Sequence, residues 1–254
     1  MSVAIVVLVL CAGVCVGLTG IGGVAVVPGL SVLADMPLTR AVPASTLAFL
    51  FTGLIATWRF RTVRRATTAA PGAAPPARHP LLALQVAALL GAALGALSLP
   101  WVSGTGMHLA LAALSLGSGL QSLLGRAVPE DAAPRATPGM LAGIGLAVGI
   151  GSAWSGTGGP ILLLPALVWL STPTRAAIAM AQAVQLPIAL AATAVNAWAG
   201  QLDWRLGTTL GAVLVAGWLV GDRLAARMPI LLLRRLLGGL LVLLGLWYAF
   251  HTLT

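Results

Sequence analysis

The sequence contains very little charge and no lysine. Only 7% of its 254 residues are charged, against about 25% in a typical soluble domain, while 59% are hydrophobic. A soluble protein of this length needs a polar surface that this composition does not provide, whereas a chain surrounded by lipid does not need one. The same composition excludes a disordered chain, which requires low hydrophobicity and high charge. We therefore expect an integral membrane protein.

Cysteine is also scarce, and the side chains that most enzymes use are missing from the apolar segments. The two cysteines, Cys11 and Cys15, lie one helical turn apart with no third ligand nearby, so we expect no metal site. No carboxylate falls inside an apolar stretch, and no nucleotide-binding motif is present. We therefore expect neither an enzyme nor ATP-driven transport, and no cofactor.

All of the basic residues other than histidine are arginines. They are placed between the apolar stretches and form no continuous basic face, which argues against nucleic-acid binding. Connecting segments rich in arginine face the cytoplasm in membrane proteins. Segments 59–80 and 223–235 are therefore predicted to lie on the cytoplasmic side of the cell membrane. We expect 59–80 and the linker 126–138 to be flexible and exposed to water.

The apolar stretches have lengths suited to membrane helices, with two exceptions. Most approach the ~20 residues that cross a bilayer as a helix. Stretches 3–33 and 139–170 are too long for one crossing and too short for two, and a glycine cluster interrupts each of them. The stretches are 3–33, 41–58, 81–100, 105–125, 139–170, 176–199, 206–221 and 236–253.

The two interrupted stretches begin two similar halves. Placing Gly20 on Gly156 also aligns the glycines that follow, and further along it aligns Pro37 with Pro173. Two broken segments, each followed by proline, arginine and an alanine-rich span, indicate an internal duplication. The expected organisation is a first repeat over 1–125, a linker over 126–138 and a second repeat over 139–254.

Charge and parity predict how the repeats are oriented. An even number of crossings must separate two cytoplasmic segments, yet an odd number of apolar stretches lies between 59–80 and 223–235. Stretch 139–170 must therefore contribute either no crossing or two crossings, as a re-entrant hairpin or two short legs would. We expect the same of stretch 3–33. Each half then crosses an odd number of times. The expected fold is an all-α polytopic membrane protein of about eight transmembrane segments, in two inverted homologous repeats with broken or re-entrant first segments.

The glycine clusters are the strongest candidates for a binding site. Consecutive glycines weaken a helix, and Pro160 is well suited to begin one, so a helix should stop before each cluster and restart after it. A restarted helix presents free N–H groups and a positive dipole end, which bind an anion without a charged side chain. Close helix packing through small residues is the alternative explanation. The predicted binding residues are Thr19, Gly20, Gly22, Gly23, Ser155, Gly156, Thr157, Gly158 and Gly159.

Polar residues in the span after each break are further candidates for binding. Ser45 and Thr46 follow the first break, and Gln182 and Gln185 follow the second. We expect all four side chains to point into one cavity. The alternative is a single interhelical hydrogen bond for each of them.

At the glycine clusters the chain resembles the TauE/SafE family of sulfite exporters. That family carries a glycine-rich run, an apolar stretch with Pro-x-Leu, and then a proline followed by an alanine-rich span. The first copy here has Pro28-Gly-Leu30 and the second has Pro165-Ala-Leu167. The third glycine of the family pattern is Val24 in one half and Pro160 in the other. The resemblance covers essentially the whole chain and implies movement of sulfite, thiosulfate, organosulfonates or other small anions across the cytoplasmic membrane.

These observations predict a multi-pass protein of the cytoplasmic membrane that acts as a secondary transporter or facilitator for a small anion. The alternative is a membrane scaffold or accessory subunit without transport. The expected partners are the anionic substrate and the lipid bilayer, with no nucleic acid, and a homodimer is left open.

Overall fold

The computed structural model describes residues 2–20, 23–68, 78–101, 137–170, 172 and 174–253, together with single positions and pairs between 109 and 124. Within these ranges all regular secondary structure is helical. The first half contains α1 (Val3–Thr19), a 3-10 turn (Gly23–Ala25), α2 (Val26–Ala34), α3 (Leu38–Thr68), α4 (Arg78–Ser98) and a second 3-10 turn (Leu99–Trp101). The second half contains α6 (Pro138–Ser155), α7 (Pro160–Trp169), α8 (Thr174–Trp198), α9 (Trp204–Ala225) and α10 (Ile230–Leu253).

Five of the described helices are long and apolar enough to cross a membrane. The remaining apolar helices are shorter, and α1 is one of these. The crossing candidates are Leu38–Arg59, Leu81–Ser98, Pro138–Ser155, Ala176–Trp198 and Trp204–Ala225. The chain is therefore a polytopic helical membrane protein, in agreement with its composition.

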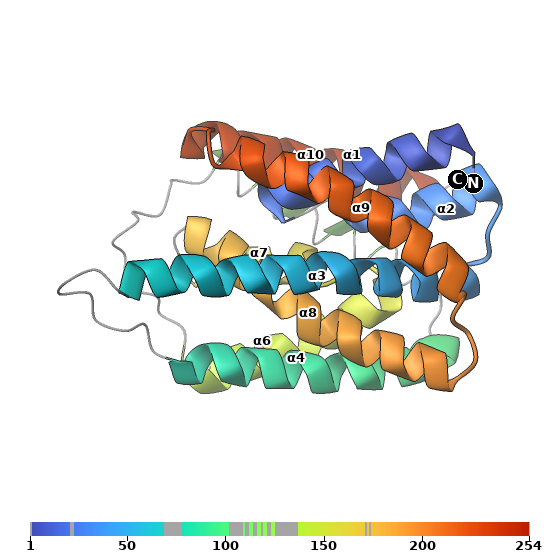
Figure 1. The fold of residues 1–254 in the computed structure, drawn as a ribbon, viewed down its shortest axis with the longest axis horizontal. Helices are drawn as coiled ribbons and strands as arrows, with labels where there is room; N and C mark the ends of the chain where they lie inside the picture. Colours follow the sequence, from blue (N-terminus) through green and yellow to red (C-terminus); the bar gives the residue numbers. More distant parts are fainter. Residues whose placement is uncertain are drawn as a thin grey trace.

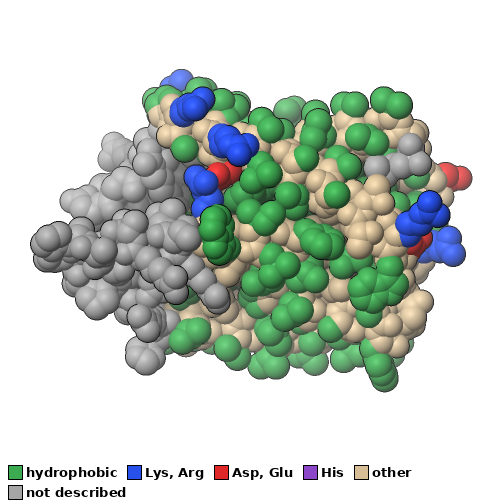
Figure 2. All heavy atoms as spheres, viewed as in Figure 1, with side chains coloured by type: hydrophobic (Ala, Val, Ile, Leu, Met, Phe, Trp, Pro, Cys, Tyr) green, Lys and Arg blue, Asp and Glu red, His purple; other side chains and the backbone are tan. Residues whose placement is uncertain are grey.

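The surface has the distribution expected of a protein in a bilayer. Figure 2 shows hydrophobic side chains over the middle of one face, with arginine and acidic side chains near its two ends. Large apolar side chains in the middle of α4 face outward, and Val86 and Leu90 are 58% and 54% exposed. Exposed tryptophans at or near the ends of the apolar spans fit the interfacial positions that this residue prefers. They are Trp58, Trp101, Trp198 and Trp204.

Each half of the chain packs its broken segment against a helix of the other half. The first helix of one half, α1, crosses α9, and the first helix of the other, α6, crosses α4. Both pairs run parallel, because successive positions of one helix meet successive positions of the other. The third pairing, α3 with α8, is antiparallel, since Gly53 contacts Leu186 while Thr46 bonds to Asn196.

Glycine permits both parallel crossings. A Cβ atom on Gly17 would lie 2.7 Å from the backbone nitrogen of Asp222, and one on Gly149 would lie 2.7 Å from that of Ala92. No side chain fits at such distances, so small residues four apart let the backbones touch, as in other membrane helices. The glycine pairs are Gly13 and Gly17 with Gly217 and Gly221, and Gly91 and Gly95 with Gly145 and Gly149.

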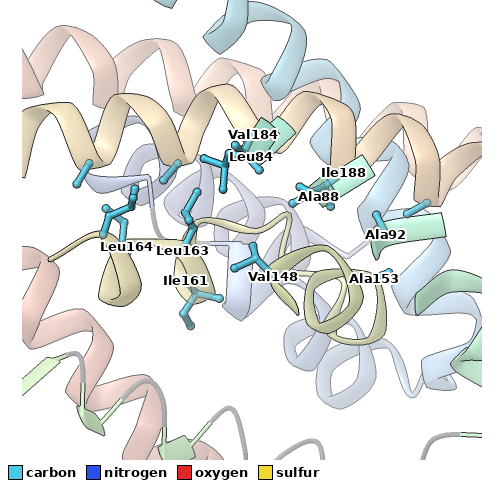
Figure 3. Packing of buried hydrophobic residues seen from close by; sticks show 14 of the residues in the cluster. Leu84, Ala88, Ala92, Val148, Ala153, Ile161, Leu163, Leu164, Val184 and Ile188 are labelled. Atoms are coloured by element: carbon cyan, nitrogen blue, oxygen red, sulfur yellow. The ribbon is translucent and has the colours of Figure 1, made fainter. Parts of the chain in front are cut away.

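Two hydrophobic clusters follow these pairings. The larger is built mainly from α4, α6, α7 and α8, and Figure 3 shows Leu84 and Ala88 beside Val184 and Ile188 within it. The second is built mainly from α1, α2, α3 and α9, with Trp218 fully buried. The clusters therefore combine helices from both halves of the sequence.

Both broken segments return toward the end at which they start. Gly207 lies against Leu47 and Gly211 against Phe51, so α9 is parallel to α3 as well as to α1. Since α1 and α3 run the same way, α2 must bring the chain back between them, as Figure 1 shows. In the second half, α4 begins where α3 finishes, so α6 runs with α4 and α8, and α7 brings the chain back.

Two expectations from the sequence are wrong at the end of the molecule where α3 and α9 finish. Segment 59–68 was expected to be a flexible loop, but α3 continues through Thr68. Arginine and alanine favour a helix, and after residue 59 the first proline is Pro71. No carboxylate was expected inside an apolar span, but Asp222 lies in the last turns of α9 and forms an ion pair with Arg59 at 2.9 Å.

We expect Gly149→Leu to destabilise the protein, because the new side chain would separate α6 from α4. Overpacking of this kind typically costs about 1–3 kcal/mol. The matched control is Gly143→Leu on the same helix, where a Cβ atom would have no neighbour within 4 Å. Thermal unfolding in detergent should show a lower midpoint for Gly149→Leu alone. Equal midpoints for the two variants would contradict this close contact.

Candidate functional site

Both long segments break at a glycine in the left-handed conformation. Gly20 ends α1 with φ 78° and Gly156 ends α6 with φ 63°, and each donates its N–H to the carbonyl four residues earlier. Side chains disfavour this conformation, so glycine is the usual residue at such a helix end. In the second break Gly158 and Gly159 also have positive φ, at 78° and 107°, before Pro160 begins α7. The breaks predicted from the glycine clusters are thus confirmed.

The two breaks lie against each other in the interior. The Cβ position of Gly20 is 3.8 Å from the Cβ of Pro160, and that of Gly23 is 2.8 Å from the carbonyl oxygen of Thr157. From α3, the buried Ser45 hydroxyl lies 3.1 Å from the carbonyl of Gly156, to which it donates. Residues far apart in the sequence therefore form one continuous centre.

Phe49 of α3 packs against both breaks. Its ring contacts the Cβ position of Gly23 and lies 3.1 Å from that of Gly158, and only 1% of the residue is exposed. The ring thus closes the space between the two chain reversals. The alignment that places Gly20 on Gly156 pairs Phe49 with Gln185, a polar residue.

The second break holds several polar groups without partners. Among the described residues, no hydrogen bond is found for the backbone N–H groups of Gly158, Gly159 and Ile161. The Ser152 hydroxyl is buried without a hydrogen bond, 3.5 Å from the Cβ position of Gly159. Free N–H groups at a helix start attract negative charge. This break therefore has the features of an anion site.

Amide side chains of α8 join the two halves next to the breaks. Gln185 donates from Nε2 to the Thr52 hydroxyl at 2.6 Å and toward the Phe49 carbonyl at 3.4 Å. Gln182 donates to the carbonyl of Val16, in the last turns of α1, at 3.2 Å. The Gln185 Oε1 atom is buried and has no donor.

Most of the predicted site residues come together, but not all of them do. Thr46 accepts from Asn196 at 3.3 Å, and the structure gives it no contact with either break. Thr19 donates to the carbonyl of Cys15 within its own helix. Gly22 lies outside the described residues. The predicted residues that meet at the centre are Gly20, Gly23, Ser45, Ser155, Gly156, Thr157, Gly158, Gly159, Gln182 and Gln185.

Two residues at this centre were missed from the sequence. Phe49 gave no signal, because an apolar residue in an apolar span is expected to face lipid or the core. Ser152 stands one turn before Ser155 in the second cluster, and that spacing places both on one helix face.

These features define the class: a multi-pass helical membrane protein built around two broken segments, an architecture typical of transporters. The family model described as "Sulfite exporter TauE/SafE" matches residues 5–248. The chain therefore belongs to the TauE/SafE family, as its glycine clusters predicted. Neither the curated proteins nor the solved structures gave a match. The general function of the family is transport across a membrane, which agrees with a non-enzymatic role.

We expect Gly23→Ala to destabilise the protein by about 1–3 kcal/mol, because its Cβ would meet the Phe49 ring and the Thr157 carbonyl. Removing the ring in Gly23→Ala/Phe49→Ala should relieve part of this cost. The unfolding midpoints of the two single variants and the double variant, measured in detergent, should therefore be non-additive. Strictly additive losses would contradict the contact between the Phe49 ring and the first break.

Proposed function

We propose that the protein is a secondary transporter or facilitator that moves a small anion, such as sulfite, thiosulfate or a sulfonate, across the cytoplasmic membrane. The observation that carries this proposal is the second break, where the N–H groups of Gly158, Gly159 and Ile161, on either side of Pro160, have no hydrogen-bond partner among the described residues. In lipid such groups cost several kcal/mol each when left unpaired. A substrate anion would supply the missing acceptors.

The helix pairings support two inverted repeats, over 1–125 and 139–254 with the linker 126–138 between them. Exchanging α1 with α6, α3 with α8 and α4 with α9 turns the pairing of α1 with α9 into that of α6 with α4, and the pairing of α3 with α9 into that of α8 with α4. The corresponding helices also run in opposite directions. Helices α1 and α3 run toward the end of the molecule at which α6 and α8 begin. Inverted repeats of this kind let a transporter open to either side by rocking one group of helices against the other.

The predicted binding residues and Ser152 take different parts in this proposal. Gly158, Gly159 and Ser152 would hold the anion at the start of α7, and the Ser155 and Thr157 hydroxyls, 2.8 Å apart, would support the turn. The first break, with Thr19, Gly20, Gly22 and Gly23, would form the opposing wall. Phe49 would keep the path closed in the state seen here.

A non-transporting scaffold is the second candidate, and the tight packing of Phe49 against both breaks favours it. Anion flux distinguishes the two functions. We expect proteoliposomes to take up radiolabelled sulfite, thiosulfate or a taurine-like sulfonate. Gly158→Leu should lower this flux at least about tenfold, because leucine is strained at positive φ and would fill the turn.

Gly143→Leu is the matched control, since its side chain would project into open space from α6. This variant should keep the flux of the unmodified protein, and both variants should first be shown to be folded by their unfolding midpoints. An absence of protein-dependent flux for every anion tested would favour the scaffold. Equal flux in the two leucine variants would remove the second break from the transport path.

The orientation is tested with single cysteines in a background carrying Cys11→Ser and Cys15→Ser. The arginine-rich segments 59–80 and 223–235 should face the cytoplasm. Each re-entrant hairpin should leave the two residues that flank it on the same side of the membrane. We therefore expect an impermeant maleimide to label Ser2→Cys, Asp35→Cys and Gln201→Cys in intact cells, and Arg227→Cys only after permeabilisation. Labelling of Ser2→Cys and Asp35→Cys from opposite sides would exclude the first hairpin.

A further inference from the structure

No described residue at the two breaks carries positive charge. The described arginine side chains lie toward the ends of the helices, where Arg59 pairs with Asp222. Within the described part of the chain, an anion at the second break would therefore be balanced by backbone N–H groups and hydroxyls. The cost of removing an ion from water rises with the square of its charge in the Born description, so a dianion costs about four times as much as a monoanion. A centre of this kind favours a single negative charge.

The Gln185 side chain adds a second requirement, because its hydrogen bonds fix which way the amide points. The Phe49 carbonyl only accepts, and the Thr52 hydroxyl donates to this same carbonyl at 3.1 Å. With its proton on that carbonyl, the Thr52 hydroxyl accepts from the amide nitrogen of Gln185 at 2.6 Å. Reversing the amide would set its oxygen against the Phe49 carbonyl, 3.4 Å from the present position of the nitrogen, and would turn the Thr52 proton away from that carbonyl.

This arrangement leaves the Gln185 carbonyl oxygen buried without a donor. The residue is 1% exposed, and its Cγ lies 3.5 Å from the Cβ position of Gly158. A buried acceptor without a donor costs about 1–3 kcal/mol. The side chain that carries this oxygen thus lies against Gly158 of the second break, and the oxygen attracts a donor and repels a bare anion.

We propose that the second break selects a singly charged oxyanion that still carries a proton, such as hydrogensulfite, over dianions and over monoanions without an O–H group. This inference rests on the proposed function and concerns the same site. The O–H group of the substrate would donate to Oε1 of Gln185. Its charged oxygens would accept from the N–H groups of Gly158 and Gly159 and from the Ser152 hydroxyl.

The preference for an anion with an O–H group follows a general rule of binding specificity. A site built around a buried hydrogen-bonding group rejects an analogue that lacks the matching group, because the group is then left unpaired. Here the rejected analogues are sulfate, which is doubly charged, and methanesulfonate, which has one charge and no O–H donor. Loss of one such bond corresponds to about a tenfold change in affinity.

The test measures sulfite uptake into proteoliposomes at a fixed total concentration, above and below the pH at which hydrogensulfite loses its proton. Uptake by protein-free liposomes is subtracted at each pH, because sulfur dioxide crosses lipid unaided. We expect the protein-dependent flux to follow the hydrogensulfite concentration. Sulfate and methanesulfonate should compete at least about tenfold more weakly than unlabelled hydrogensulfite.

Variants then assign the preference to Gln185. Gln185→Leu should reduce the advantage of hydrogensulfite over methanesulfonate to within about twofold. The control Gln85→Leu removes an amide that bonds to the Ala183 carbonyl at 3.2 Å, away from the breaks, and should keep the advantage. If Gln185→Leu does not fold, the pH and competition measurements on the unmodified protein still decide the matter.

Two results would overturn the inference in different ways. Protein-dependent flux that follows the sulfite dianion, or equal competition by methanesulfonate, would refute the requirement for a proton while leaving anion transport in place. An absence of protein-dependent flux for every anion at every pH would refute the proposed function itself, and the inference with it.

Discussion

The structure depends on one constraint, which is that backbone N–H and C=O groups must find partners where water is absent. A helix satisfies this rule along its length but not at its ends. The chain places two helix breaks at Gly20 and Gly156 and then buries each against the other half. The reversals are tolerated because protein, and not lipid, surrounds them. The groups still unpaired at the second break are therefore the place where a ligand has most to contribute.

The two breaks share a backbone design but differ in their side chains. Corresponding positions carry Phe49 in the first half and Gln185 in the second, and both residues lie against Gly158. Phe49 fills space without polar requirements, whereas Gln185 brings a donor and an acceptor into a dry centre. The two breaks thus meet one apolar side chain and one polar side chain. In the proposed inverted repeats, this difference would let a symmetric architecture hold one chemically specific site.

The sequence predicts the membrane class and the breaks because each has a strong local cause. A glycine cluster stops a helix, and a proline such as Pro160 begins the next one, so the breaks can be read from the local sequence. The low charge and high hydrophobicity of the composition indicate a chain surrounded by lipid. The end of α3 was harder to predict, because an arginine-rich segment continues a helix as readily as it forms a loop. The roles of Phe49 and Ser152 depend on contacts between segments that are distant in the sequence, which no local pattern encodes.

The hydrophobic clusters suggest which parts of the molecule can move as units. Since α1 packs on α9 and α6 packs on α4, neither half of the chain forms a separate body. One cluster instead joins α1, α2, α3 and α9, and the other joins α4, α6, α7 and α8. The boundary between them passes through the contact of α3 with α8, where the Gln185–Thr52 and Asn196–Thr46 bonds lie. Any rocking that opens the centre must therefore disturb these polar contacts. Hydrogen bonds of this kind are easier to break and re-form than close apolar packing. The same side chains that orient Gln185 toward the breaks thus lie on the surface where the two bodies would separate.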